Sequence, residues 1–144
     1  MKGLRIAAAA CLAVTGYVHA DLYIHGYRVI PVIGPAFLVQ ASGSFAVALL
    51  LIVGAAVTAE PVALRVAGAA LAAGALAGFV ASRTVGVFGF VERGLQPSPQ
   101  ALLSVLAEVG VVLLLAAAAV TRRRAAGDVV SSRVPTRLRR RATR

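Results

Sequence analysis

The chain has 144 residues, of which 60% are hydrophobic and only 14% are charged, and its mean hydropathy is +0.88. Soluble domains carry about a quarter of their residues as charges, so the composition excludes an ordinary soluble protein and predicts an integral membrane protein. The 15 basic and 5 acidic residues give a net charge of +10, and the single Cys11 excludes an internal disulfide and thiol redox chemistry within one chain.

Four apolar stretches are each close to the roughly 20 residues that a helix needs to cross the hydrocarbon core. They predict membrane spans at residues 6–24, 36–57, 62–81 and 101–120. Because lipid offers no partner for backbone polar groups, each span makes its hydrogen bonds within its own helix. The predicted fold is an all-α, four-helix transmembrane bundle over residues 1–120, followed by a disordered Arg-rich tail over residues 121–144.

The first span has an alternative interpretation as a cleaved signal peptide. Lys2 and Arg5, the apolar run after them and the small residues around His19 resemble the three regions of such a signal, with cleavage after Ala20. Cleavage would leave three spans. A retained span is favoured, because a further apolar run follows without the polar start that is usual after a signal.

The segment Tyr17–Tyr27 at the end of the first span gathers both histidines and all three tyrosines of the chain. On a helix its alternation becomes two stripes at a spacing of four residues, which lie roughly 160° apart. They cannot both face one partner unless the helix frays near Gly26. We expect the tyrosines to lie at the outer membrane interface, where amphipathic rings settle among headgroups.

The second and third spans carry different small and polar patterns. In the second span Gln40 and Ser44 are four residues apart, so both lie on one face in the outer half of the membrane. In the third, Gly74 and Gly78 form a GxxxG pair that predicts close packing against another helix.

The fourth span places Gln100, Ser104 and Glu108 on one helix face at successive spacings of four residues. Glu108 lies roughly 14 Å along the helix from Pro99 and therefore near the bilayer midplane. An ionised acid there costs about 2.5 to 3.5 kcal/mol on insertion scales. We therefore expect the Glu108 carboxyl to be protonated, paired or hydrated.

Charge sets the expected orientation. The N-terminus carries Lys2 and Arg5, and residues 121–144 carry nine Arg and one Asp. The positive-inside bias predicts that both termini lie in the cytoplasm of a multi-pass protein of the bacterial cell (inner) membrane. In the tail, the residues expected to contact anionic lipid headgroups are Arg122, Arg123, Arg124, Arg137, Arg139, Arg140 and Arg141. Nucleic acid is not an expected partner, because the tail lacks interleaved aromatic residues.

Three of the four predicted helices place polar side chains in the outer half of the membrane, which predicts an outward-facing polar pocket. We expect Glu108 at its floor, His19, Gln40 and Ser44 on its walls, and Asp21, Arg83, Glu92 and Arg93 near its rim. Ser104, on the same helix face as Glu108, is a further candidate pocket residue. For His19 and Glu108, a structural hydrogen bond is the competing interpretation, and for Asp21 it is ordinary solvation at the interface. Neither a metal nor another cofactor is expected, because HExxH and paired-histidine spacings are absent and both histidines lie on one segment.

The sequences HADLY, GYRVIPVIGPAFLVQ and FGFVE resemble a group of small, four-span, largely uncharacterised integral membrane proteins of G+C-rich Gram-positive bacteria. In that group a histidine before Leu-Tyr or Leu-Trp precedes a Y-x-x-I-P-x-I-G-x-x-F-L segment. The resemblance covers about residues 15 to 110. It implies four retained spans, and it implies that His19 and the segment 31–34 belong to one unit, but it carries no activity.

The function expected from these features is a non-enzymatic one, because the sequence shows no nucleophile, metal or nucleotide motif. The first expectation is an accessory or small-ligand-binding membrane component whose pocket uses His19, Gln40 and Glu108. The alternative is a small proton-coupled transporter or channel in which Glu108 exchanges a proton with the outside. Four short helices are a small body for alternating access, so the alternative predicts a homo-oligomer or a larger membrane complex.

Overall fold

The structure, a computed structural model, describes residues 2–56 and 62–133. Its described part is helical: α1 (Lys2–Ile24), the short 3-10 helix η1 (Tyr27–Val29), α2 (Ile33–Ala56), α3 (Val62–Thr84) and α4 (Gln100–Arg133). All four α-helices are long and apolar enough to cross a membrane. The predicted all-α bundle of four long apolar helices is confirmed, and their length and composition suggest a multi-pass membrane protein.

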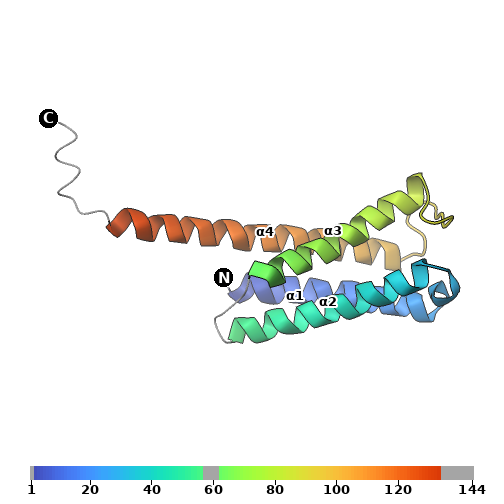
Figure 1. The fold of residues 1–144 in the computed structure, drawn as a ribbon, viewed down its shortest axis with the longest axis horizontal. Helices are drawn as coiled ribbons and strands as arrows, with labels where there is room; N and C mark the ends of the chain where they lie inside the picture. The colour runs from blue at the N-terminus through green and yellow to red at the C-terminus, as the bar shows by residue number, and fades with distance from the viewer. Residues whose placement is uncertain (1, 57–61, 134–144) are drawn as a thin grey trace.

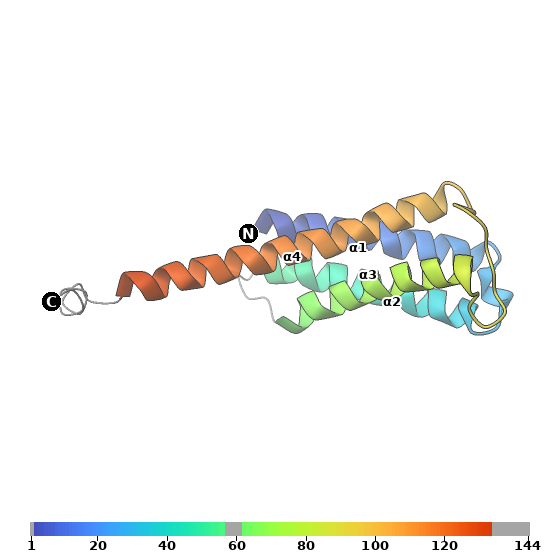
Figure 2. The same ribbon diagram turned by 90° about the horizontal axis from the view of Figure 1, so that it is seen from above.

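The helices run up and down, so the bundle has two different ends (Figure 1). The start of α1, the end of α2, the start of α3 and the last part of α4 lie at one end, which we call the terminal end. The connections from α1 to α2 and from α3 to α4 lie at the other, which we call the loop end (Figures 1 and 2).

The packed core fills the half of the bundle nearer the terminal end. All four helices contribute to it, with Ala8, Ala9, Leu12, Val47, Ala48, Leu51, Ala72, Val111 and Leu115. Helix α1 packs along α2 and α4, whereas α3 contacts its neighbours less extensively. Figure 1 shows α3 diverging from α2 toward the loop end. This divergence leaves room for a cavity between the helices.

Helix α4 continues well beyond the predicted end of its span, through Arg133. The prediction that the tail is disordered is therefore wrong for residues 121–133. Arg and Ala are among the strongest helix formers, and extending an existing helix costs far less than starting a new one. Of the Arg residues expected to contact lipid, Arg137, Arg139, Arg140 and Arg141 lie outside the described residues.

The expected packing of another helix against Gly74 and Gly78 does not occur among residues 2–56 and 62–133. A Cβ atom added at either glycine would meet nothing within 4 Å. The physical reason is the divergence of α3, which places both residues beside the cavity. Close packing on α3 occurs at Gly68 instead, where an added Cβ would lie 3.1 Å from the side chain of Leu115.

The connection between α1 and α2 is held close to the bundle by two glycines. Gly26 follows the end of α1 with a φ of 145°, in a region that only glycine enters easily, and it turns the chain back. Gly34 lies in the first turn of α2, where an added Cβ would lie only 2.7 Å from the Arg28 carbonyl oxygen. The absence of a side chain at Gly34 therefore lets η1 lie directly on α2.

Candidate functional site

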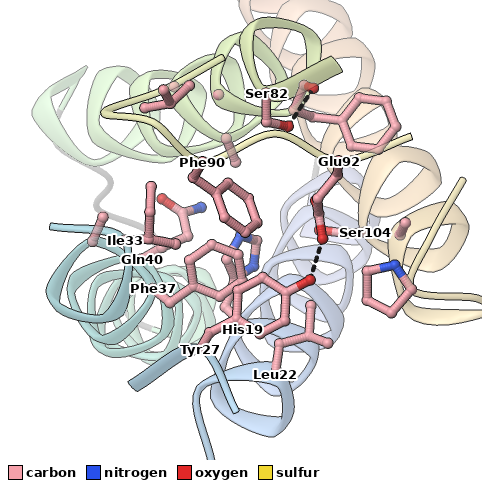
Figure 3. Close-up of a pocket in the computed structure, with 18 of the residues that line it drawn as sticks. His19, Leu22, Tyr27, Ile33, Phe37, Gln40, Ser82, Phe90, Glu92 and Ser104 are labelled. Carbon is pink, nitrogen blue, oxygen red and sulfur yellow. Dashed lines mark hydrogen bonds between the residues drawn. The ribbon is translucent and has the colours of Figure 1, made fainter. Parts of the chain in front are cut away.

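A cavity of about 210 Å³ lies between the helices in the half of the bundle nearer the loop end. Its polar lining includes Glu108 and Ser104 from α4, His19 from α1, Gln40 from α2, and Ser82 and Arg83 from α3. Aromatic and small residues complete the wall (Figure 3). The structure thus brings to one cavity six of the residues predicted for the pocket and its rim: His19, Gln40, Arg83, Glu92, Ser104 and Glu108.

Glu108 lies at the bottom of this cavity, one helical turn from the core residue Val111. Only 1% of its surface is exposed, and the Ser104 hydroxyl donates a hydrogen bond of 2.7 Å to its Oε1 atom. The two residues are one turn apart on α4, so the helix itself fixes this pair. Glu108 is thereby the acidic group at the floor of the cavity, whereas Glu92 lines it from the connection between α3 and α4.

His19 is oriented by its own helix and by α2. Its Nδ1 lies 2.9 Å from the Thr15 carbonyl oxygen, and its ring centroid lies 4.9 Å from that of Phe37. Because a carbonyl oxygen only accepts hydrogen bonds, Nδ1 carries the proton of this contact. In the neutral imidazole, Nε2 is then left as the hydrogen-bond acceptor that the ring can offer.

Gln40 joins α2 to α3 at the wall of the cavity. Its Nε2 donates a hydrogen bond of 3.3 Å to the Leu71 carbonyl oxygen and reaches the Ser44 hydroxyl at 3.5 Å. Ser44, expected on the wall, is fully buried beneath Gln40 and does not line the cavity. Its hydroxyl contacts the side-chain amide of Gln40 from within the packed interior.

An aromatic cluster of Tyr27, Phe37 and Phe90 lies over the cavity, as Figure 3 shows. The rings of Tyr27 and Phe37 are stacked at 4.8 Å between centroids, and Phe90 meets Tyr27 edge-on at 5.7 Å. The three rings come from η1, α2 and the connection between α3 and α4. They hold the two connections together at the loop end.

Arg83, in the last turn of α3, fixes the connection to α4. It donates hydrogen bonds to the carbonyl oxygens of Gly94 at 2.8 Å and Gln96 at 2.6 Å, and it pairs with the Glu92 carboxylate at 3.0 Å. Its guanidinium also lies 3.6 Å from the centroid of the Phe79 ring. These contacts hold residues 85–99 as a cap, which we call the α3–α4 cap.

Tyr27 closes the cap from the opposite side, because its hydroxyl donates a hydrogen bond to Glu92 (Figure 3). Burial of the ring, and then the adjacent Glu92 carboxylate, raise the pKa of the Tyr27 phenol well above its ordinary value. The phenol therefore keeps its proton and remains a donor. The expectation that Tyr27 is an interface anchor is wrong: the turn at Gly26 brings the ring inward, whereas Tyr17 is 66% exposed.

Two of the polar residues predicted near the rim lie apart from the cavity lining. Asp21 pairs with His25 at 3.0 Å and accepts a hydrogen bond from Gln100 at 3.4 Å, which ties α1 to the start of α4. Arg93 is exposed and does not line the cavity, whereas Arg83 and Glu92 do.

Sequence reasoning did not identify the aromatic cluster or the central position of Arg83 in the cap. A usable signal existed for the arginine: Phe79 and Arg83 are four residues apart at the end of a span, and the next residues include FGFVER. The meeting of Tyr27 with Glu92, which are 65 residues apart, has no local signature.

The cavity combines the Glu108 carboxyl group, the His19 imidazole and the Gln40 amide with the Arg83–Glu92 ion pair of the cap and a mostly apolar and aromatic wall. Within residues 2–56 and 62–133, no group of three His, Cys, Asp or Glu side chains could hold a metal ion. The arrangement suits non-covalent binding of a small molecule, because such sites are mostly apolar and use a few placed polar groups for orientation. In comparisons with known protein families, curated proteins and solved structures, nothing matches this chain.

Proposed function

We propose that this protein binds a small ligand in the cavity beneath the α3–α4 cap, as a non-enzymatic component of the bacterial cell membrane. The single observation that carries the proposal is the meeting of His19, Gln40 and Glu108, from three helices, at one cavity. Polar groups are expensive inside a membrane bundle, and an intramembrane acid is by default a candidate functional site.

The ligand that fits best is a small amine with an apolar body. The Glu108 carboxylate would pair with the ammonium group, and a cation near the faces of Phe37 and Tyr27 gains a further contribution of about 0.5 to 2 kcal/mol. A ligand carboxylate would instead lie beside Glu108 and be repelled. The apolar walls favour a compact hydrocarbon body over a sugar or a nucleotide.

A matched set of probes tests this proposal: cyclohexylamine, cyclohexanol and cyclohexanecarboxylate share one ring and differ in the group offered to Glu108. Thermal unfolding of the detergent-solubilised protein can be followed with a dye that reacts with Cys11, the chain's single thiol. A ligand at a hundred times its Kd stabilises the folded state by about 2.7 kcal/mol. We expect cyclohexylamine to raise Tm and cyclohexanecarboxylate to leave it unchanged.

The control variants separate the site from the rest of the protein. Glu108→Gln should lose the response to cyclohexylamine, whereas Asp21→Asn, which alters an acid outside the cavity lining, should keep it. Equal responses of the two variants, or equal shifts with all three probes, would contradict the proposal.

The orientation that goes with this function places both termini in the cytoplasm and the cavity toward the outside. Its basis is the positive-inside bias: Lys2, Arg5, Arg65 and Arg122–Arg124 all lie on the parts of the helices nearer the terminal end. The Arg residues at the end of α4 would contact anionic headgroups of the inner leaflet, each contributing about 1 kcal/mol. Cysteine labelling from outside and inside intact cells, at Cys introduced for Phe88 or Arg124, distinguishes the two orientations.

A second candidate is a proton-coupled transporter or channel that works as a homo-oligomer. The observation that favours it is the position of Glu108: it lies between a packed core on one side and a cap held by an ion pair on the other. Such a carboxyl could bind and release a proton as the cap opens. Proton uptake into vesicles should be abolished by Glu108→Gln and kept by Asp21→Asn, and an unchanged uptake in Glu108→Gln would exclude this function.

A further inference from the structure

A second concave surface lies at the terminal end, between the first part of α3 and the second half of α4. It is a groove of about 510 Å³, lined on one side by Arg65 and Val66 and on the other by Leu115, Ala119, Arg122 and Arg123 among others. Its lining residues come from the start of α3 and the second half of α4, which lie close together in Figure 1. Both helices are long and apolar enough to cross a membrane, and in a membrane an open groove between them would face lipid.

The strongest indication that the groove binds a ligand comes from the guanidinium group of Arg65. Its Nη1 is buried and has no hydrogen-bond partner within the described part of the chain. The guanidinium group remains charged at any physiological pH. A buried donor without an acceptor costs about 1 to 3 kcal/mol, and a charged one costs more. A site with such a donor is incomplete until an acceptor, and preferably an anion, occupies it.

The charges around the groove favour an anion over any other headgroup. Of the described residues that line it, three are Arg and none is acidic. Guanidinium groups match phosphate oxygens in pairs of parallel hydrogen bonds, so three of them at one groove suit a phosphodiester. A zwitterionic headgroup gains less, because its ammonium group finds no carboxylate among the described residues of the lining.

The shape of the groove adds a requirement for an acyl chain. Ala119 lies one turn before Arg122 and Arg123 on α4, and Leu115 lies roughly 10 Å from Arg122 along the helix. The lining is therefore charged toward the terminal end and apolar toward the middle of the bilayer. This is the order of headgroup and hydrocarbon in a phospholipid of the leaflet at that end.

We propose that the groove between α3 and α4 is a binding site for one anionic phospholipid, with its phosphate held by Arg65 together with Arg122 and Arg123. The acyl chain lies along Val66, Ala119 and Leu115. This site differs from the diffuse attraction of a basic tail to a charged membrane, because it requires a particular residue of α3 and an apolar groove.

Native mass spectrometry of the full chain, purified in detergent and stripped of lipid, tests the proposal by counting bound lipids. The probes are phosphatidylglycerol and phosphatidylcholine with the same acyl chains. We expect one phosphatidylglycerol to bind at least about tenfold more tightly than phosphatidylcholine. We expect Arg65→Gln to weaken phosphatidylglycerol binding about tenfold, as loss of one charge-assisted hydrogen bond implies.

The matched control is Arg124→Gln, which removes the same charge from an exposed position of α4 that does not line the groove. It should change the affinity by less than about twofold. If Arg65→Gln does not fold, Arg65→Lys keeps the charge but loses the paired hydrogen bonds, and its affinity should still fall below that of Arg124→Gln. Equal binding of the two lipids, or equal losses in the Arg65 and Arg124 variants, would overturn the proposal.

A soluble competitor separates a lipid site from a simple phosphate site. Glycerol 3-phosphate offers the phosphate without an acyl chain, so it should not displace phosphatidylglycerol when added at the same concentration. Displacement at equal concentration would show that the groove recognises phosphate alone, which contradicts the proposed role of its apolar wall.

Discussion

Replacing Arg83 with Gln should release the α3–α4 cap while leaving the bundle folded. The arginine makes two hydrogen bonds to the cap backbone and one ion pair with Glu92, at distances of 2.6 to 3.0 Å. A hydrogen bond from a charged group contributes about 1.5 to 3 kcal/mol, and breaking a fully buried pair costs about 3 to 5 kcal/mol. The side chains of Arg83 and Glu92 are 12% and 16% exposed, so the pair is not fully buried. When the cap opens, water hydrates both groups and offsets part of the lost interaction.

We therefore expect a loss of about 3 kcal/mol in the free energy that keeps the cap closed, well below the sum of the separate contributions. That loss raises the population of the open cap about a hundredfold. The Glu92 amide, which donates a 3.0 Å hydrogen bond to the Ser82 carbonyl oxygen, reports the opening directly. Hydrogen exchange of peptides covering residues 85–95 should accelerate by about the same factor, and exchange around Glu108 should not change.

Two further variants make this experiment specific. Arg93→Gln removes an exposed charge of the same connection and should leave its exchange unchanged. The double variant Arg83→Gln/Glu92→Gln should open no more than Arg83→Gln alone, because part of the single variant's cost is an unpaired Glu92 carboxylate. An acceleration below about threefold in Arg83→Gln would refute the view that this residue holds the cap.

Two more variants test the loop end. Tyr27→Phe should destabilise the cap by about 1 kcal/mol, through the lost hydrogen bond to Glu92, as measured by exchange of the same peptides. The tyrosinate absorbance that this variant loses should develop only well above pH 10, the ordinary phenol pKa. Because the folded-state pKa is raised, the phenol's contribution to stability is complete below about pH 10 and decreases as the pH rises further. Gly34→Ala should lower Tm by the equivalent of about 1 to 3 kcal/mol, since its Cβ would lie 2.7 Å from the Arg28 carbonyl oxygen. Gly74→Ala, which adds its Cβ where nothing lies within 4 Å, should not lower Tm, and an equal drop in both variants would contradict this argument.

The fold was predictable because its determinants are local. Apolar runs of membrane-spanning length, broken by Gly, Pro and charge, predicted four spans whose observed bounds differ by only a few residues at most ends. The exception is the end of α4. The prediction ended the helix where the apolar run ended, but helix propagation depends on backbone propensity, and Arg and Ala continue a helix in water as well as in lipid.

The site was predictable to the extent that it lies on single helices. The spacing of four residues placed Ser104 and Glu108 on one face, and depth along the spans placed His19 and Gln40 at a similar level. Ser44 shows the limit of this reasoning: it shares a face with Gln40 but points into the packed interior beneath it. A residue's depth follows from its position in the span, whereas its neighbours depend on how each helix is rotated.

What the sequence could not show is how the connections return over the bundle. Placing Tyr27 beside Glu92 requires the φ of Gly26, the close approach at Gly34 and the hydrogen bonds of Arg83 all at once. Each of these features depends on the tertiary structure. The aromatic cluster follows from them, because Phe37 and Phe90 both pack against Tyr27 only when both connections are in place.

The small residues of α3 have a different consequence from the one that their spacing predicts. In a bundle of closely packed helices, a GxxxG pair allows two backbones to approach. Here α3 is held near α4 at Gly68 but diverges toward the loop end, so Gly74 and Gly78 form part of the cavity wall. A larger side chain at either position would enter the space above Glu108. If α3 ran close alongside its neighbours, these glycines would allow the helices to pack together. Because α3 tilts away, the same glycines leave space that forms part of the cavity.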